Sequence, residues 1–355
     1  MLEFLEDLLA ALGVILNGLP QGLLALSYGF ASVPTALGFA VGAASCAALG
    51  STVPISFQAE TIVLAGSMGK DRSERTSMVF FAGLLMLVLG LTGGLGFIVE
   101  LAGDRIITGM MAGVGLMLAR IALQGAKEMP LVTYSSILIA CVTYVLSKGN
   151  LVYTIIISVV LSSAINYYKN GKIEGEVYDE SRRLKLVKPK LTWRTARGAA
   201  ALACLTIGAN IAFGQITASM AGGTANVDHL TAYSGAADAL SALFGGGPVE
   251  AIISATAAAP HAVLAGIMMM SLMAIILFMK LLPKIGKYVP SASIYGFLFI
   301  LGAVVTVPVN AGLAFNGASS DEALLAGVSM AVTAGLDPFL GLLAGLVVKA
   351  IIHLI

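Results

Sequence analysis

The sequence predicts an all-α membrane protein with about fourteen transmembrane segments, arranged as two inverted repeats of seven segments each. Three observations lead to this prediction: an apolar composition, regular interruptions of the apolar runs, and a similarity between the two halves. Hydrophobic residues make up 58% of the 355 residues and charged residues only 11%, whereas about a quarter of a soluble domain is charged. At about 20 residues per helix, the chain has room for a dozen or more spans.

Glycine, proline and charged residues divide the apolar sequence into its expected segments. The first repeat, residues 1–168, is expected to contain segments at 5–28, 32–49, 53–68, 76–99, 104–124, 131–147 and 150–168. The second repeat, residues 195–355, is expected to contain segments at 195–218, 230–246, 248–266, 267–283, 290–310, 321–335 and 337–354. A long polar connection separates the repeats, and we predict a basic cytoplasmic loop over residues 169–194.

The basic residues are distributed unevenly between the two sides of these segments. Seventeen of the twenty lysines and arginines fall on one side, nine of them within residues 169–197. The three exceptions are Arg105, Lys148 and Lys349. Because cytoplasmic loops carry an excess of Lys and Arg, the loops at 70–75, 169–197 and 280–287 are predicted to be cytoplasmic and both termini to lie outside. The expected location is the cell membrane (inner or plasma membrane), which the chain crosses many times.

The two halves share short similarities at one offset of about 200 residues. Residues 63–68 read VLAGSM and residues 263–268 read VLAGIM, each after a glycine-rich stretch that contains a proline. The first segment of each half also carries two amides about one helical turn apart. These amides are Asn17 and Gln21 in the first half, and Asn210 and Gln215 in the second. Because seven is an odd number, the second half must enter the membrane from the opposite side, which defines an inverted repeat.

Segments 3 and 10 are the candidate binding segments, because each begins with glycine and proline residues that break a helix. The breaks at Pro54 and Pro248 free backbone groups that can bind a polar ligand, aided by the positive end of a half-helix. An ionisable residue in the hydrocarbon core is costly and marks a functional site. Glu60 and Glu250 occupy nearly equivalent points, and Gln58 lies two residues before Glu60. The alternative is that each glutamate lies at a water-exposed helix end.

Asp238 and the four amides each have two possible interpretations. Asp238 in segment 9 either belongs to the site or caps and pairs locally. The four amides either bind the donor and acceptor edge of a planar solute or join two helices by hydrogen bonds. Both readings stay open at this point.

No catalytic residue, cofactor or metal site is expected. The three cysteines lack CxxC spacing, and the three histidines are scattered, so neither set predicts a disulfide or a metal centre. HExxH and GxSxG motifs are absent from the sequence, which argues against an enzyme. The expected partners are a small-molecule substrate and the lipid bilayer, without nucleic acid.

Two stretches carry a resemblance to a known family. Residues 101–126 (LAGDRIITGMMAGVGLMLARIALQGA) and 241–257 (SALFGGGPVEAIISATA) resemble segments 5 and 10 of the nucleobase–cation symporter-2 (nucleobase–ascorbate transporter) family, in its adenine/guanine/hypoxanthine permease branch, as a distant member. The resemblance implies core and gate domains, a short strand in each of segments 3 and 10, and a binding site formed by segments 1, 3, 8 and 10. It also implies an elevator-like movement of the core domain coupled to H⁺ or Na⁺, and a homodimer.

This chain departs from the family pattern at three points. The acidic residue of segment 8 would fall near Phe213 or Gly214. The glutamate of segment 10 would fall near Ser254, which enters the candidate site for that reason, while Glu250 lies one turn earlier. Family members also place both termini in the cytoplasm, opposite to the charge distribution here.

The expected function is secondary active transport of a small polar solute, with a nucleobase or purine-like compound favoured and H⁺ or Na⁺ as the coupling ion. One alternative is a small cation, guanidinium-like or a metal ion, held by the paired glutamates. Another is a sulfate-permease-like anion transporter, in which the glutamates would have to be protonated. A channel fits less well, because the polar residues concentrate at a few sites and do not form a continuous path.

Overall fold

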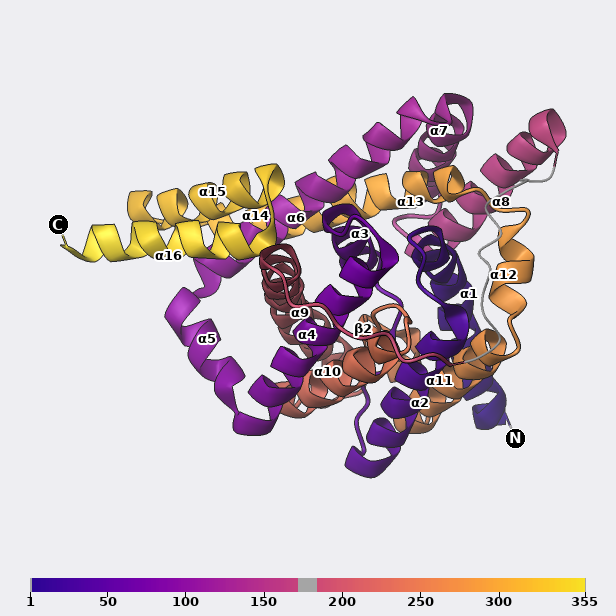
Figure 1. Cartoon of the computed structure of the whole chain (residues 1–355), viewed down its shortest axis with the longest axis horizontal. Coiled ribbons are helices and arrows are strands. Elements are labelled where there is room, and N and C mark those ends of the chain that lie inside the picture. The colour runs from indigo at the N-terminus through magenta and orange to yellow at the C-terminus, as the bar shows by residue number, and fades with distance from the viewer. Residues whose placement is uncertain (1, 172–183, 355) are drawn as a thin grey trace. The chain divides into compact units, whose positions relative to one another are not determined.

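The computed structural model describes residues 2–171 and 184–354, and these residues are predominantly helical (Figure 1). The predicted helical class is therefore confirmed. Residues 172–183 of the expected basic loop lie outside the described residues. By clustering of contacts the chain divides into two units, and each unit draws on both halves of the sequence. Unit 1 comprises Met1–Gly93, Tyr167–Ala199 and Ala209–Ser291, and unit 2 comprises Gly94–Asn166, Ala200–Gly208 and Ala292–Ile355.

Unit 1 contains the two broken segments, 3 and 10, together with the helices around them. In its first part these are α1 (Leu2–Ser27), α2 (Ser32–Leu49), β1 (Ile55–Ser56), α3 (Ala59–Met68) and α4 (Arg72–Thr92). In its later part they are α10 (Val227–Leu243), β2 (Glu250–Ala251), the 3₁₀ turn η2 (Ala255–Ala258), α11 (Ala262–Phe278) and α12 (Leu281–Gly286). Helix α9 (Trp193–Met220) contributes residues to both units.

Unit 2 is built from helices alone in the described part of the chain. Its elements are α5 (Gly94–Ala102), α6 (Asp104–Gln124), η1 (Gly125–Lys127), α7 (Pro130–Leu146), α8 (Leu151–Asn170, whose last turn belongs to unit 1), η3 (Ser291–Ile294), α13 (Tyr295–Phe299), the π-helical η4 (Ile300–Thr306), α14 (Val307–Phe315), α15 (Ser320–Gly335) and α16 (Pro338–Leu354). Helices α15 and α16, in yellow, pack beside α6 (Figure 1).

Seven helical stretches within the described ranges are long and apolar enough to cross a membrane. They are Leu2–Ser27, Ser32–Leu49, Arg72–Thr92, Asp104–Lys127, Leu151–Asn170, Trp193–Met220 and Ser291–Phe315. Four apolar helices are shorter: Ala59–Met68, Pro130–Leu146, Ala262–Phe278 and Pro338–Leu354. The count of fourteen segments, the inverted repeat and the repeat boundaries at 168 and 195 stay predictions.

Two expected segment boundaries are wrong for identifiable reasons. The segment predicted over 248–266 is not one helix: it contains β2 and η2, and α11 begins only at Ala262, directly after Pro260 and His261. The segment predicted over 76–99 ends at Thr92, because Gly93 adopts a left-handed conformation (φ 69°) that terminates α4. The short helix α5 follows from Gly94.

Close packing of α4 against α10 depends on glycine. A Cβ atom at Gly83 would lie 2.7 Å from both the Ala239 nitrogen and the Gly235 oxygen. A Cβ atom at Gly235 would in turn lie 2.5 Å from the Leu87 nitrogen. Small residues let helix backbones approach in this way in membrane proteins. The contact fixes α10, which carries Asp238, against α4.

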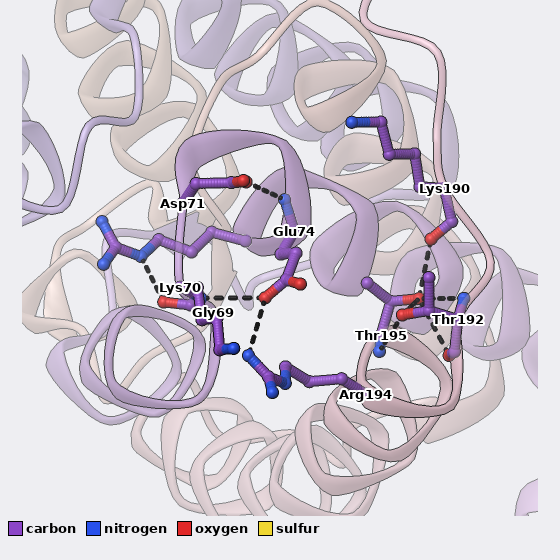
Figure 2. Close-up of polar contacts among 9 residues, drawn as sticks. Gly69, Lys70, Asp71, Glu74, Lys190, Thr192, Arg194 and Thr195 are labelled. Carbon is purple, nitrogen blue, oxygen red and sulfur yellow. Dashed lines mark hydrogen bonds and ion pairs between the residues drawn. The ribbon is translucent and has the colours of Figure 1, made fainter.

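The basic connections after α3 and before α9 meet at one end of unit 1 (Figure 2). Glu74 accepts a hydrogen bond from the Lys70 N–H (2.9 Å) and forms an ion pair with Arg194 (3.5 Å). Asp71 caps α4 by accepting from the Glu74 N–H (2.8 Å). Thr192 and Thr195 form a reciprocal capping box at the start of α9. The sequence analysis placed both connections on the same side, and the structure brings them together.

We expect Arg75→Ala to destabilise unit 1. The Arg75 guanidinium donates to the carbonyls of Gly69 (3.0 Å) and Tyr28 (2.6 Å) and lies over the Tyr28 ring at 5.5 Å. Hydrogen bonds from a charged donor contribute about 1.5–3 kcal/mol each, so the melting temperature should fall clearly. Arg75→Lys should rescue only part of the loss, because an ammonium group lacks the planar fork.

The matched control for this prediction is Arg120→Ala. Arg120 is exposed on α6 and makes no polar contact within the described chain. Thermal unfolding in detergent measures both variants. Equal melting temperatures for the Arg75→Ala and Arg120→Ala variants would contradict the proposed role of Arg75.

Candidate functional site

The two broken segments pair with each other inside unit 1. Strands β1 and β2 are antiparallel, with Ile55 opposite Ala251 and Ser56 opposite Glu250. Pro54 and Pro248 precede them, and proline favours an extended conformation in the residue before it. Antiparallel pairing satisfies backbone groups that would otherwise be unpaired at this depth. The break predicted from sequence thus becomes a short, buried two-stranded sheet, with all four residues of the two strands buried.

Glycines on the covering helices allow a close approach to this sheet. On α2, a Cβ atom at Gly42 would lie 2.5 Å from Ile55 Cγ1, and one at Gly38 would lie 2.8 Å from Val249 Cγ2. On α1, a Cβ atom at Gly18 would lie 3.2 Å from Ser56 Oγ. These glycines therefore let α1 and α2 pack closely against the two strands.

The amino terminus of α3 directly follows β1 and has no side-chain cap. Gln58 is the N-cap residue, but its side chain makes no capping hydrogen bond. The first N–H groups of a helix lack intrahelical partners and carry a partial positive charge. Glu60 lies in this first turn, is 4% exposed, and its carboxylate accepts from its own backbone N–H. The start of α3 is therefore a buried anion-attracting position that an acidic side chain partly occupies.

Two buried polar atoms at and just before this terminus, Ser56 Oγ and Gln58 Nε2, lack a hydrogen-bond partner among the described residues, as does Asn17 Oδ1 on α1. Leaving a buried polar group unpaired costs about 1–3 kcal/mol, so such atoms call for a physical explanation. A polar ligand that accepts from the Gln58 amide and the Ser56 hydroxyl would satisfy two of them. These two side chains and the α3 terminus form what we call the α3 site.

A pair of carboxyl groups lies on the other strand. Asp238 of α10 accepts a hydrogen bond from the Val249 N–H at 2.7 Å, and its carboxyl group is also hydrogen-bonded to that of Glu250. Two carboxyl groups can share a hydrogen bond only if one of them carries a proton. The Asp238–Glu250 pair can therefore hold a proton at the strand pair.

The other predicted residues are placed as follows. Gln21 donates to the Asn17 carbonyl within α1 (3.3 Å), and Ser254 bonds to Thr256 Oγ1 (2.6 Å) at the start of η2. Asn210 donates to Thr231 Oγ1 and Ser234 Oγ, both at 3.2 Å, and so joins α9 to α10. Gln215 is exposed on α9. The structure thus brings Gln58, Glu60, Glu250 and Ser254 to the broken segments, and a role in substrate binding stays a prediction for all eight residues.

Sequence reasoning missed Ser56. It lies in the phrase PISFQAE, between the helix-breaking proline and Gln58, and its position inside the break was the available signal. The sequence left Asp238 with two interpretations, a site residue or a local cap, and its hydrogen bond to Glu250 of β2 could not be predicted from its own segment.

The described part of the chain contains a cavity outside the broken segments and no cluster of metal-ligating side chains. Among the described side chains, no group of three or more His, Cys, Asp or Glu residues is arranged to hold a metal ion. A cavity of about 580 Å³ lies in unit 2, lined by Phe97, Leu101, Leu346, Lys349 and other residues of α5 and α16. It contains none of the predicted site residues.

The fold is similar to that of known membrane transporters. The transmembrane domain of a cyanobacterium bicarbonate transporter, BicA, superimposes with a TM-score of 0.71 at 16% identity, covering 96% of this chain and 97% of that chain. The murine Solute Carrier 26 family member A9 (Slc26a9) anion transporter in the inward-facing state gives 0.75 at 16% identity, covering 99% and 68%. A further structure of SLC26A9 gives 0.71 at 16% identity, covering 99% and 65%.

These comparisons define the chain as a multi-pass membrane protein with a transporter fold. The similar structures are transporters and not enzymes, in agreement with the sequence analysis. The sequence matches no model of a known protein family, and no curated protein is significantly similar to it in sequence.

The expected membership of the nucleobase–cation symporter-2 family is wrong, because the similar structures are anion transporters of a different family. The two families have similar folds, and the phrases that suggested the resemblance serve packing. In residues 101–126, a Cβ atom at Gly113 would lie 2.5 Å from the Met330 oxygen, and one at Gly115 would lie 2.9 Å from the Gly302 oxygen. Glycines of this kind indicate close contacts between helices and do not indicate which substrate is bound.

Proposed function

We propose that the chain is a secondary active transporter of a small anion, coupled to a proton. The observation that carries the proposal is the α3 site: a helix amino terminus without a side-chain cap beside two buried atoms that lack a partner in the described chain, Ser56 Oγ and Gln58 Nε2. A helix amino terminus with free N–H groups suits an anion. The similar structures are those of a bicarbonate transporter and an anion transporter, which supports the same substrate class.

The donors of the α3 site suit an oxyanion or a halide. The Gln58 amide and the Ser56 hydroxyl can both donate to it, and the first turn of α3 adds backbone N–H groups. An anion can share this turn with Glu60 only when that carboxyl group holds a proton, because two adjacent negative charges repel. Protonation also releases the backbone N–H that the carboxylate accepts from.

Glu60 is therefore the proposed coupling group, and the Asp238–Glu250 pair is a second proton position. Na⁺ is the alternative coupling ion. The anion and the proton would bind together and cross together, which is the arrangement of a symporter.

We also propose that unit 1 moves as a whole in an elevator-type transport cycle. Every residue of the α3 site, together with Asp238 and Glu250, belongs to unit 1, so a movement of this unit carries the whole site. We keep the cytoplasmic position of the basic loops and the homodimer as parts of the proposal. The unevenly distributed charge supports the first, and analogy alone supports the second.

The proposal predicts that anions, and not cations, stabilise the purified protein. Bicarbonate, sulfate, chloride and small carboxylates would be compared with guanidinium and divalent cations at constant ionic strength. A ligand that binds only the folded state adds about 2.7 kcal/mol at a hundredfold excess over its Kd. At least one anion is expected to raise the melting temperature, and more so at low pH.

Ser56→Ala should weaken this stabilisation, because it removes a donor of the α3 site. The matched control is Ser67→Ala, which removes an exposed hydroxyl from the other end of α3. Stabilisation by guanidinium or a metal ion without stabilisation by any anion would instead support the alternative of a cation transporter. An anion effect that Ser56→Ala and Ser67→Ala leave equally intact would place the ligand elsewhere.

A further inference from the structure

Residues 184–192 form a non-helical segment of unit 1 that leads into Trp193, the first residue of α9, and we call residues 184–193 (LKLVKPKLTW) the basic segment. The Val187 N–H donates to the carbonyl of Leu243 at the end of α10 (2.8 Å). The Lys190 N–H donates to Ser77 Oγ of α4 (2.9 Å), and its carbonyl accepts from Thr195 Oγ1 (2.7 Å). The backbone is therefore held across the ends of α4, α9 and α10.

The side chains of the basic segment are exposed although many of them are apolar. The exposed fractions are 47% for Leu184, 62% for Leu186, 71% for Leu191 and 81% for Trp193. Lysines at 185, 188 and 190 alternate with them and are also exposed. An ordered, exposed segment with both apolar and cationic side chains needs a partner that accepts both, since exposed apolar surface in contact with water is unfavourable.

Two acidic residues of the described chain near the basic segment are already engaged. Glu74 binds Arg194 and the Lys70 N–H, and Asp71 caps α4. Figure 2 draws no interaction at the ammonium group of Lys190; the hydrogen bonds of this residue are those of its backbone N–H with Ser77 and of its carbonyl with Thr195. Lys185, Lys188 and Lys190 form no ion pair with a described acidic residue. Their charge is available to a negatively charged partner.

We propose that the basic segment binds anionic phospholipids of the leaflet that adjoins this end of unit 1. Two of the three helices that it crosses, α4 and α9, are long and apolar enough to span the membrane, so it lies at the depth of the headgroups. The leucines and Trp193 reach the boundary with the acyl chains, where tryptophan is enriched. The lysines neutralise headgroup phosphates, as polybasic segments beside membrane spans do. This inference does not depend on the identity of the transported solute.

Trp193 allows a direct test, because it is the single tryptophan of the sequence. The full chain would be placed in nanodiscs of phosphatidylcholine with a fixed fraction of anionic phosphatidylglycerol. Two preparations of the same composition would be compared, one in which the phosphatidylglycerol is brominated and one in which the phosphatidylcholine is brominated, since bromine quenches tryptophan fluorescence on contact. We expect brominated phosphatidylglycerol to quench Trp193 more strongly than brominated phosphatidylcholine. The preference should fall by at least about fivefold in the variant K185Q/K188Q/K190Q, because one lysine at an anionic surface already contributes about that factor.

The matched control is K280Q/K284Q/K287Q, which removes the same charge from another connection of unit 1. It should keep the preference. An equal loss in both triple variants would attribute the enrichment to diffuse surface charge and overturn the proposal. Trp193 that neither brominated lipid quenches would show that the basic segment faces a soluble partner or water, which also overturns it.

Discussion

Replacing Glu60 by glutamine is expected to make anion binding independent of pH. Under the proposed coupling, the anion binds only wild-type molecules in which Glu60 is protonated, so affinity should rise as the pH falls, by up to about tenfold per pH unit for one linked proton. Glutamine has the shape of the protonated acid and no charge. The Glu60→Gln variant should therefore bind the anion at every pH as the wild type does at low pH, and should lose uphill transport driven by a pH gradient.

Uptake into proteoliposomes, with and without an imposed pH gradient, measures this effect together with the pH dependence of the Kd. Glu60→Asp should keep pH dependence, because it keeps a carboxyl group. Glu128→Gln, an exposed change directly after η1, should leave both quantities unchanged. If Glu60→Gln retains the full pH dependence, the linked proton is elsewhere, and Glu250→Gln becomes the variant to compare. If pH has no effect on the wild type but Na⁺ does, the coupling ion is Na⁺.

The broken segments show how much of the site the sequence could predict. Proline and glycine act locally, so Pro54 and Pro248 identified the breaks, and the cost of burying charge identified Glu60 and Glu250. All four observations need only the residue and its neighbours. The structure places both glutamates in the interior of unit 1, and the alternative of water-exposed helix ends is not what it shows.

Pairing between distant residues could not be predicted in the same way. The register that sets Ser56 opposite Glu250 and the contact of Asp238 with Val249 depend on the tertiary fold. The same holds for Asn210, whose partners Thr231 and Ser234 lie on another helix. An amide pattern alone could not distinguish a substrate ligand from a helix-joining group, and the family resemblance failed because glycine-rich packing is common to transporters of this fold.

Gly83→Val should have the largest effect on stability. Its Cβ atom would lie 2.7 Å from backbone atoms of α10, which cannot move aside as a flexible side chain can. The two helices would have to separate, and overpacking of this kind costs about 3 kcal/mol. Because α10 carries Asp238, separation also disturbs the hydrogen bond to the Val249 N–H. Transport should therefore fall together with stability.

A thiol-reactive fluorophore reports this unfolding, because Cys46 and Cys204 are buried in the folded chain. The matched control is Gly13→Val on α1, where an added Cβ atom meets nothing within 4 Å. It carries the same penalty for a β-branched residue in a helix without the clash, so the difference between the two melting temperatures isolates the α4–α10 contact. Equal melting temperatures would mean that the two helices do not approach at Gly83. A loss of stability with unchanged transport would mean that transport does not depend on the position of Asp238 that the α4–α10 contact sets. Glu60 would then be the single proposed coupling group.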